Sequence, residues 1–242
     1  MIHQASSGFR HFALKNWHGF LSIIYPTNCH VCGRELPGGI THICPLCLSE
    51  LDFTYFEKYT TPNPAEELFW GRITLAHVFC LLYFKKEGAT QELLHTIKYK
   101  NGKDLAIHCG EKMGYQWMKE RPDSKFDAII PIPLHDKKAF KRGYNQSLLL
   151  AEGLKEHINA PVVEALYRKR HHASQTKKNR FERQDNVKSI FGVTPERLEG
   201  KSHVVIIDDV LTTGATLEAA AQAILHHNPD IKVSLFTLAL AR

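Results

Sequence analysis

Residues 203–216 read HVVIIDDVLTTGAT and join three kinds of sequence: a run of four apolar residues, two adjacent acids, and small hydroxyl-bearing residues around a glycine. A short, uninterrupted apolar run is typical of a strand that is buried on both faces of a parallel sheet. We therefore expect residues 204–207 to form a central strand, with Asp208 and Asp209 where the chain leaves the sheet. The helix-favouring sequence LEAAAQAIL follows from Leu217, so the segment predicts a strand, a tight loop and the start of a helix.

The loop between this strand and this helix has the composition of a phosphate-binding loop. Backbone N–H groups at a helix start and threonine hydroxyls both donate to phosphate oxygens, and Gly214 permits a positive φ and close approach of a ligand. The candidate phosphate-binding residues are Thr212, Thr213, Gly214, Ala215 and Thr216. A Walker loop is excluded because no lysine follows Gly214.

The two acids need a partner other than phosphate. Asp208 and Asp209 could accept hydrogen bonds from vicinal sugar hydroxyls, or hold a divalent metal shared with a diphosphate, and a phosphorylated ribose meets both demands. The competing interpretation is structural, an Asp-Asp turn followed by a threonine helix cap.

Helix and strand patterns alternate over most of the chain outside this stretch. Strands are predicted at 74–84, 127–130, 204–207 and 231–238, and helices at 90–100, 104–120, 143–158 and 217–226. This alternation predicts an α/β fold in which helices cover both faces of a parallel sheet. Ligands of such sheets bind at the carboxyl ends of the strands, where the two acids are expected.

The excess positive charge of the chain, formally +6, lies in one segment. Residues 168–183 contain seven lysines and arginines against Glu182 alone, which favours a phosphate-bearing partner, either a small phosphorylated ligand or a nucleic acid. A solvated basic loop is the alternative. Further positive charge follows the predicted strand 127–130, at Lys137, Lys138, Lys141 and Arg142.

Four of the six cysteines form two pairs, Cys29/Cys32 and Cys44/Cys47, separated by eleven residues. Four thiolates close a tetrahedral shell and leave no open position, so the spacing predicts a structural Zn²⁺ site. An iron–sulfur cluster is the alternative because thiolates bind both.

Basic and aromatic residues accompany the cysteine pairs, namely His30, Arg34, His42, Phe53, Tyr55 and Phe56. Basic groups with nearby aromatics suit single-stranded DNA through phosphate contacts and base stacking. The same aromatic residues could equally form the core of the small module.

Three segments are predicted along the chain. Residues 1–25 have the spacing of an amphipathic helix, whose apolar face would pack on the protein's own core or on a membrane surface. Residues 26–60 form the cysteine module, and the turn-rich sequence at 59–64 separates it from a larger domain at 65–242. The longest apolar run, 78–84, is too short to span a bilayer, and the amino terminus lacks the pattern of a cleaved signal, so a cytoplasmic protein is expected.

The order of these motifs resembles the ComF family of competence proteins and their relatives, over nearly the full length. VVIIDDVLTTGAT is similar to the phosphoribosyl diphosphate signature of type I phosphoribosyltransferases. The accompanying motifs are the four-cysteine module, KYKN at 98–101, PIP at 131–133, RGYNQ at 142–146, and Gln175, Arg183 and Asn186 ahead of Phe191.

This resemblance implies a type I phosphoribosyltransferase-like fold with an amino-terminal zinc ribbon, and it assigns residues to roles. Asp208 and Asp209 would contact the ribose as catalytic residues, and the loop 212–216 would bind the 5-phosphate. The diphosphate, with Mg²⁺, would lie against Lys137, Lys141 and Arg142. A mobile loop carrying Arg170, Gln175, Arg180 and Arg183 would close over the ligand.

Two functions stay open at this point. The first is Mg²⁺-dependent phosphoribosyl transfer to an unidentified base or amine. The second is a non-catalytic or weakly catalytic accessory protein that binds phosphoribosyl diphosphate and single-stranded DNA during uptake, processing or recombination, with a DNA-uptake helicase as a candidate partner.

Overall fold

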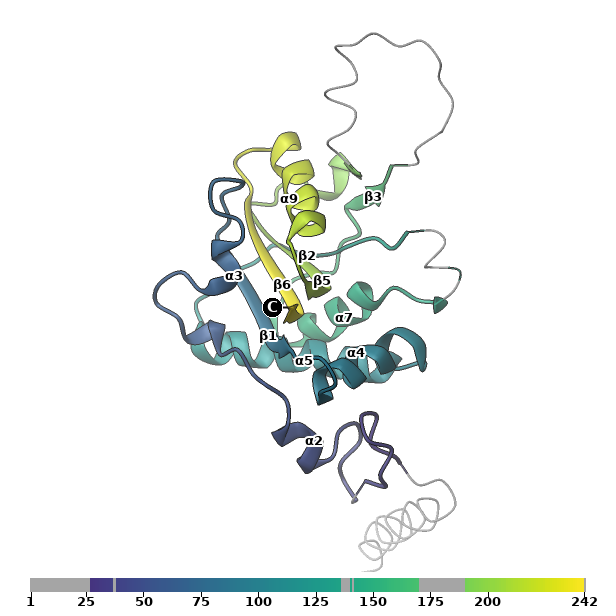
Figure 1. Ribbon diagram of the computed structural model, residues 1–242. Coiled ribbons are helices and arrows are strands. Elements are labelled where there is room, and N and C mark those ends of the chain that lie inside the picture. Colours follow the sequence, from purple (N-terminus) through teal and green to yellow (C-terminus); the bar gives the residue numbers. More distant parts are fainter. Residues whose placement is uncertain (1–26, 37, 136–139, 141, 170–189, 242) are drawn as a thin grey trace, which may run out of the picture. The chain divides into compact units, whose positions relative to one another are not determined.

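The computed structural model describes residues 27–36, 38–135, 140, 142–169 and 190–241 (Figure 1). The chain divides into two compact units, residues 1–50 and 51–242. The predicted amphipathic helix at 1–25 lies outside the described residues. In the part of the chain that is described, no helix combines the length and the apolar character needed to cross a membrane.

The second unit is built on a parallel sheet, as the sequence predicts. Its strands are β1 (His77–Phe84), β2 (Ala128–Pro131), β5 (His203–Leu211) and β6 (Lys232–Ala241), in the order β1-β6-β5-β2. All three pairings are parallel. The central strands β5 and β6 are almost wholly buried along their apolar stretches, which explains their uninterrupted hydrophobic sequence.

Four main helices cover the sheet: α4 (Ala89–Tyr99), α5 (Lys103–Glu120), α7 (Gln146–Ile158) and α9 (Ala215–His227). Helices α4, α5 and α7 lie on one face and α9 lies on the other (Figure 1). This placement follows from right-handed crossovers. The chain moves across the sheet in one direction from β1 to β2 and on to Val162, and it moves in the opposite direction from β5 to β6. The predicted α/β class is therefore confirmed.

Helices α5 and α7 approach so closely that their backbones are in contact. A Cβ atom at Gly153 would lie 1.9 Å from the carbonyl oxygen of Ile107, and one at Gly110 would lie 2.1 Å from that of Leu150. Both distances are far below van der Waals contact, so the packing of these two helices depends on glycine at both positions.

Strand β5 is longer than predicted. Its pairing with β2 ends at Pro131↔Ile207, but its pairing with β6 continues through Asp208↔Thr237 to Leu211↔Leu240. The expectation that the two acids lie beyond the strand is therefore wrong, because β5 stays paired with β6 as far as Leu211. The acids lie instead on a segment of β5 that has a neighbouring strand on one side only.

Several short elements have no counterpart among the predicted ones. An antiparallel hairpin pairs β3 (Leu166–Arg168) with β4 (Phe191–Val193). The other short elements are the helices α2 (Pro45–Ser49) and α3 (Pro64–Glu67) and the 3-10 turns η1 (Phe56–Lys58) and η2 (Pro195–Arg197).

The division between the two units falls at Glu50, ahead of the turn-rich segment 59–64. Residues following Glu50 attach to β1: Thr54 donates its backbone N–H to Leu81, and Tyr83 donates its own to Asp52, at 3.1 and 2.7 Å. Phe56 is 1% exposed and belongs to the core of the second unit. Of the aromatic residues considered for stacking on DNA bases, Phe56 is therefore inaccessible, whereas Tyr55 is half exposed.

Candidate functional site

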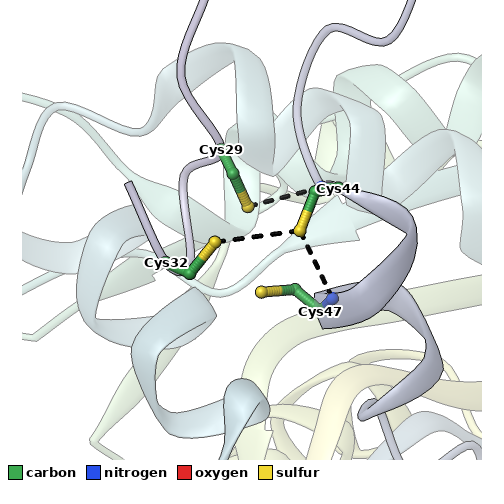
Figure 2. A group of neighbouring side chains, drawn as sticks. All are labelled: Cys29, Cys32, Cys44 and Cys47. Atoms are coloured by element: carbon green, nitrogen blue, oxygen red, sulfur yellow. Dashed lines mark hydrogen bonds between the residues drawn. The ribbon is translucent and has the colours of Figure 1, made fainter. Parts of the chain in front are cut away.

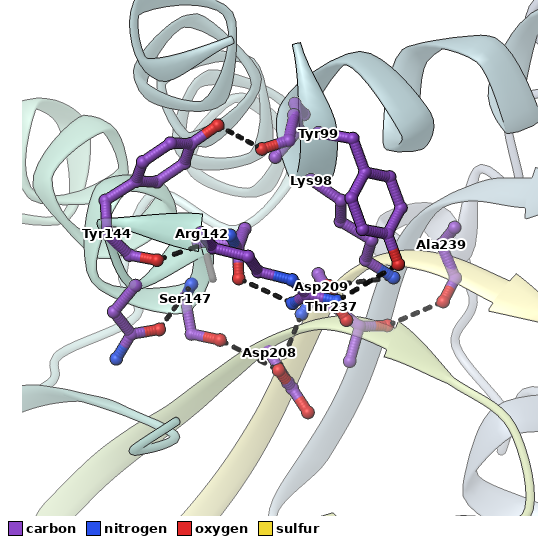
Figure 3. A network of polar contacts seen from close by, with 12 residues as sticks. Lys98, Tyr99, Arg142, Tyr144, Ser147, Asp208, Asp209, Thr237 and Ala239 are labelled. Atoms are coloured by element: carbon purple, nitrogen blue, oxygen red, sulfur yellow. Dashed lines mark hydrogen bonds and ion pairs between the residues drawn. The ribbon is translucent and has the colours of Figure 1, made fainter. Parts of the chain in front are cut away.

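Asp208 and Asp209 are the centre of a polar network at the carboxyl end of β5 (Figure 3). One oxygen of Asp208, Oδ1, accepts hydrogen bonds from the hydroxyl of Ser147 at 2.8 Å and from the backbone N–H of Asp209 at 2.9 Å. Asp209 Oδ2 forms an ion pair with Lys98 Nζ at 2.9 Å. Both acids are half-buried, so a ligand can reach them.

The surroundings of Asp208 disfavour its ionised form. Burial and the neighbouring charge of Asp209 raise the pKa of Asp208 to about 7, although the hydrogen bonds from Ser147 and Asp209 and the charge of Lys98 act in the opposite direction. Near neutral pH the pair therefore holds a proton on Asp208 for part of the time. A ligand that brings positive charge or hydroxyl donors to Asp208 would favour the ionised form.

The motif residues 98–101 and 142–146 lie against each other beside the acids (Figure 3). The guanidinium of Arg142 donates to Gln146 Oε1 at 2.9 Å and lies 5.3 Å from the ring centroid of Tyr99. The hydroxyl of Tyr144 donates to the carbonyl of Ile97. These contacts tie the end of α4 to the segment that leads into α7.

Asn145 explains why Ser147 faces the acids. Its side chain caps α7 by accepting from the backbone N–H of Ser147 at 3.1 Å, and its amide donates to the carbonyl of Ile132 at 3.0 Å. The cap therefore fixes the first turn of α7 to the end of β2, and the Ser147 hydroxyl is held within reach of Asp208.

The predicted phosphate loop joins β5 to α9. Thr212 and Thr213 are exposed, Gly214 is the N-cap of α9, and Ala215 and Thr216 open the helix. The loop thus presents the backbone N–H groups of a helix start. Thr213 Oγ1 accepts from the backbone N–H of Ala215, at 3.5 Å, but Thr213 precedes the N-cap Gly214, and α9 has no side-chain capping bond.

Gly214 has φ +79°, as expected, but its close neighbour is part of the protein. A Cβ atom there would lie 2.8 Å from Cε1 of Phe69. The same segment supplies Arg72, which donates to the carbonyl of Thr213 at 3.3 Å and pairs with Glu218 in the first turn of α9. Phe69 and Arg72 therefore support the loop from outside, a role that no sequence pattern indicated.

We expect Gly214→Ala to destabilise the protein more than Gly200→Ala. Both glycines have positive φ, but a Cβ at Gly200 meets nothing within 4 Å. The strain of the left-handed conformation should cost about 1 kcal/mol at either position, and the contact with Phe69 should add about 1–3 kcal/mol at Gly214 alone. Denaturant unfolding of both variants measures the difference, and equal losses would show that Phe69 moves aside freely.

Arg168 lies on the β2 side of the acids. Its Nε donates to the carbonyl of Pro133 at 2.9 Å, and its guanidinium lies 4.9 Å from the ring centroid of Phe191. Burial lowers the pKa of Arg168, whereas the charge of Asp208 acts against this shift. The other predicted basic and loop residues, Lys137, Lys141, Arg170, Gln175, Arg180 and Arg183, lie outside the described residues.

The first unit brings Cys29, Cys32, Cys44 and Cys47 together (Figure 2). Their sulfur atoms all lie within 4.8 Å of one another, and those of Cys32 and Cys44 are 3.7 Å apart. A tetrahedral shell with Zn–S bonds of about 2.3 Å has sulfurs about 3.8 Å apart. The four-thiol cluster that the spacing predicts is therefore present, with a size that suits such an ion.

Backbone donors surround this cluster. Cys29 Sγ accepts from the N–H of Cys44 at 3.3 Å, and Cys44 Sγ accepts from that of Cys47 at 3.4 Å. Burial alone would raise the pKa of Cys29, but backbone N–H groups of Cys32, Cys44 and Val31 lower it to about 6. At least one sulfur is thus prepared for the thiolate form that metals bind.

The parallel sheet, with paired acids at the end of a central strand and a Thr/Gly loop at the following helix start, defines a protein of the type I phosphoribosyltransferase fold class. Residues 145–242 match the family model described as the phosphoribosyl transferase domain. The chain belongs to the ComF family, whose relatives match it over most of its length.

Two such relatives have names that refer to competence and to DNA utilization. The chain is 28% identical to competence protein ComFC of Bacillus subtilis (strain 168) over 229 residues, which cover 87% of this chain and 82% of the relative. It is 30% identical to DNA utilization protein YhgH of Escherichia coli (strain K12) over 222 residues, which cover 84% and 92%. Among solved structures, glutamine phosphoribosylpyrophosphate amidotransferase from B. subtilis matches with a TM-score of 0.39 and 17% identity, over 59% of this chain and 30% of that one.

Proposed function

We propose that the protein binds phosphoribosyl diphosphate with Mg²⁺ at the acid pair and the adjoining loop. The observation that carries this proposal is the placement of Asp208 and Asp209 on β5, directly ahead of a helix start with exposed threonines. The acids suit a sugar diol, and the loop suits a phosphate group on the same ligand. The family model that matches residues 145–242 supports the same ligand.

The ligand would extend from the phosphate loop toward β2. Its 5-phosphate would accept from the loop 212–216, its ribose hydroxyls would donate to the two acids, and its diphosphate would lie toward Arg142. Lys137 and Lys141 stay predicted contacts of the diphosphate. Among the described residues, Asp208 Oδ2 and Asp209 Oδ1 are not engaged by the contacts given above, so each acid retains an oxygen for the ligand.

Mg²⁺ suits this arrangement because it prefers oxygen donors, which the diphosphate and the ribose would supply with the acids nearby. When bound, it would neutralise part of the diphosphate charge. In a transfer reaction, the bond between ribose C1 and the diphosphate oxygen breaks, and the diphosphate leaves with the bonding electrons. An acceptor nitrogen bonds to C1, and its proton passes to water. The ionised acids would stabilise the positive charge that develops on the sugar.

We expect phosphoribosyl diphosphate with Mg²⁺ to raise the melting temperature of the protein, and the double variant Asp208→Asn with Asp209→Asn to lose this effect while remaining folded. At a ligand concentration 100 times Kd the stabilisation is about 2.7 kcal/mol, which corresponds to several degrees. The matched control is Asp123→Asn with Asp230→Asn, which removes two exposed acids. Equal stabilisation of the first variant and the wild type would refute the proposed site.

A role in DNA uptake or utilisation is supported by the names of the relatives. Two versions of this role differ in chemistry: a phosphoribosyltransferase, or an accessory protein that binds phosphoribosyl diphosphate and single-stranded DNA without transfer. Isotope transfer from labelled phosphoribosyl diphosphate, surveyed across bases and nucleic acid, separates them. Transfer to any acceptor supports the enzyme, and salt-sensitive DNA binding with no transfer supports the accessory protein.

We further propose that the four cysteines hold a structural Zn²⁺. Metal analysis of the purified protein should give about one zinc per chain. Cys44→Ser should lose that zinc, because the change removes one of the four thiolates that close the tetrahedral shell. Cys109→Ser, which changes a buried thiol of the second unit, is the control and should retain the metal. Iron and sulfide in place of zinc would favour the iron–sulfur alternative.

A further inference from the structure

Two neighbouring hollows open at the amino end of β1. The smaller, of about 210 Å³, lies between the segment 59–63, the start of β1 and the end of α5. The larger, of about 420 Å³, is lined mainly by residues 120–125, and it adjoins the smaller because His77 and Arg121 line both. The two ends of an eight-residue strand such as β1 are about 23 Å apart. This region is therefore distinct from the site at the carboxyl ends of the strands.

The indole of Trp117 lines the smaller hollow and carries a buried donor without an acceptor. Trp117 is 2% exposed, and no described residue accepts a hydrogen bond from its Nε1–H. Every other buried side-chain nitrogen or oxygen in the described part of the second unit has a partner. A buried donor is costly to leave unpaired. An acceptor held in the smaller hollow would remove this cost.

Arg121 places a positive charge over the same indole. Its Nε donates to the carbonyl of Glu57 at 3.0 Å, and its Nη2 donates to that of Tyr59. Its guanidinium lies 5.1 Å from the ring centroid of Trp117. These contacts hold the guanidinium in place before any ligand binds. Among the described residues no acceptor contacts Nη1, so the two N–H groups of that nitrogen are available to a ligand.

The other polar side chains of the smaller hollow add little capacity to accept hydrogen bonds. Its acid, Glu66, already accepts from the backbone N–H of Asn63 at 3.2 Å and from that of Val78 at 3.3 Å. Burial, together with the charge of Arg121, lowers the pKa of His77 to about 4, so the His77 ring is neutral at pH 7. The available groups are mainly donors, and the hollow suits a ligand that accepts hydrogen bonds.

The surroundings limit the charge and the size of such a ligand. Two acids, Glu120 and Asp123, line the larger hollow together with two basic residues, so a group with several negative charges would also be repelled there. The smaller hollow lies below the roughly 300 Å³ at which drug-sized sites begin. Buried Phe56 and Val78 give it an apolar wall. A ligand with one negative charge and a short apolar body meets these conditions.

We propose that the smaller hollow binds a small monocarboxylate, whose oxygens accept from Trp117 Nε1 and Arg121 Nη1 and whose apolar body lies against Phe56 and Val78. The planar fork of a guanidinium matches the two oxygens of a carboxylate. This site shares no residue with the phosphoribosyl diphosphate site proposed above, so each can be tested without the other. A bound ligand would also bridge the end of α5 and the segment 59–63.

Acetate, propionate, butyrate and benzoate test the proposal, with propionamide and inorganic phosphate for comparison. Binding to the isotope-labelled full chain is followed through the indole N–H proton resonances, and Trp117→Phe identifies the Trp117 signal by its loss. At least one carboxylate should move that signal downfield along a saturating curve, because the N–H gains an acceptor. The signal of Trp70, which is 62% exposed and lies outside the hollow, should stay in place.

Arg121→Gln removes the cation and should weaken binding of that carboxylate at least about tenfold. Arg121→Lys keeps the charge but loses the fork, so it should also bind more weakly, and it decides the question if Arg121→Gln does not fold. Arg197→Gln is the matched control, because Arg197 likewise donates to a backbone carbonyl, that of Glu164 at 2.7 Å, outside the hollow. It should bind as the wild type does.

Three results would overturn the proposal. The first is a Trp117 signal that no carboxylate moves. The second is propionamide or phosphate binding as tightly as the best carboxylate, since the selection for a single carboxylate would then be absent. The third is a folded Arg121→Lys variant that binds the carboxylate as tightly as the wild type, since the guanidinium would then make no contact with the ligand.

Discussion

Gly153→Ala is expected to lower the free energy of unfolding by about 3 kcal/mol or more, the upper range of overpacking changes. The added Cβ would lie 1.9 Å from the carbonyl oxygen of Ile107 and 2.8 Å from the backbone nitrogen of Glu111. Backbone atoms cannot rotate away, so α7 would have to separate from α5 along their shared contact. Helix propensity works in the opposite direction, since alanine is favoured over glycine by about 1 kcal/mol inside a helix.

Denaturant unfolding of Gly153→Ala and Gly110→Ala measures this loss, with Gly88→Ala as the control. A Cβ at Gly88 would meet its nearest atoms at 3.4 Å and the residue has negative φ, so the control should lose less than about 1 kcal/mol. A Gly153→Ala variant as stable as the control would mean that the two helices are not packed as closely as described.

Asp208→Asn is expected to stabilise the protein in the absence of ligand, by a few kcal/mol above pH 7. The folded state raises the pKa of Asp208 to about 7, from an ordinary value near 4. Folding therefore favours the protonated acid, and the ionised acid destabilises the fold. This destabilisation is small below pH 4, grows between pH 4 and pH 7, and is fully present above pH 7. Asparagine is neutral at every pH and still accepts hydrogen bonds at Oδ1.

Melting temperatures of Asp208→Asn and the wild type at pH 5 and pH 8 test this expectation. The advantage of the variant should be clearly larger at pH 8. Asp127→Asn is the control of opposite sign, because hydrogen bonds from Ser202 and His203 lower the pKa of Asp127, so its replacement should destabilise the protein at pH 8. Charged groups near Asp208 are Asp209, Lys98 and Arg168. A variant no more stable than the wild type at pH 8 would show that these groups fully compensate the buried charge.

Much of the fold could be predicted because short stretches of the sequence carry the patterns of single strands and helices. The apolar runs that became β1, β5 and β6 and the helical spacing of α4, α5 and α9 each indicate an element without reference to distant residues. The hairpin of β3 and β4 could not be predicted in this way. Each strand has three residues, too few for a period, and the partners of Leu166–Arg168 lie more than twenty residues away in the sequence.

The sequence indicates which residue types form the candidate site, but it does not indicate which side chains contact one another there. The acids and the Thr/Gly loop are consecutive, so their pattern is visible in the sequence. Lys98 and Asp209 are far apart in the chain, and only the packing of α4 beside β5 brings them together. The KYKN and RGYNQ motifs were the available signal, but a motif does not state which side chain it meets. No sequence pattern indicated the roles of Ser147, Phe69 and Arg72, because single serine, phenylalanine and arginine residues are common in any domain.

Because Asp208 and Asp209 belong to a strand that stays hydrogen-bonded to β6, their main chain is preorganised before any ligand arrives. The sugar would meet carboxylates whose backbone spacing is already set. The protein would therefore lose little conformational entropy where it contacts the sugar. If the proposed ligand binds there, the segments that meet its phosphates should then contribute most of the ordering that binding requires.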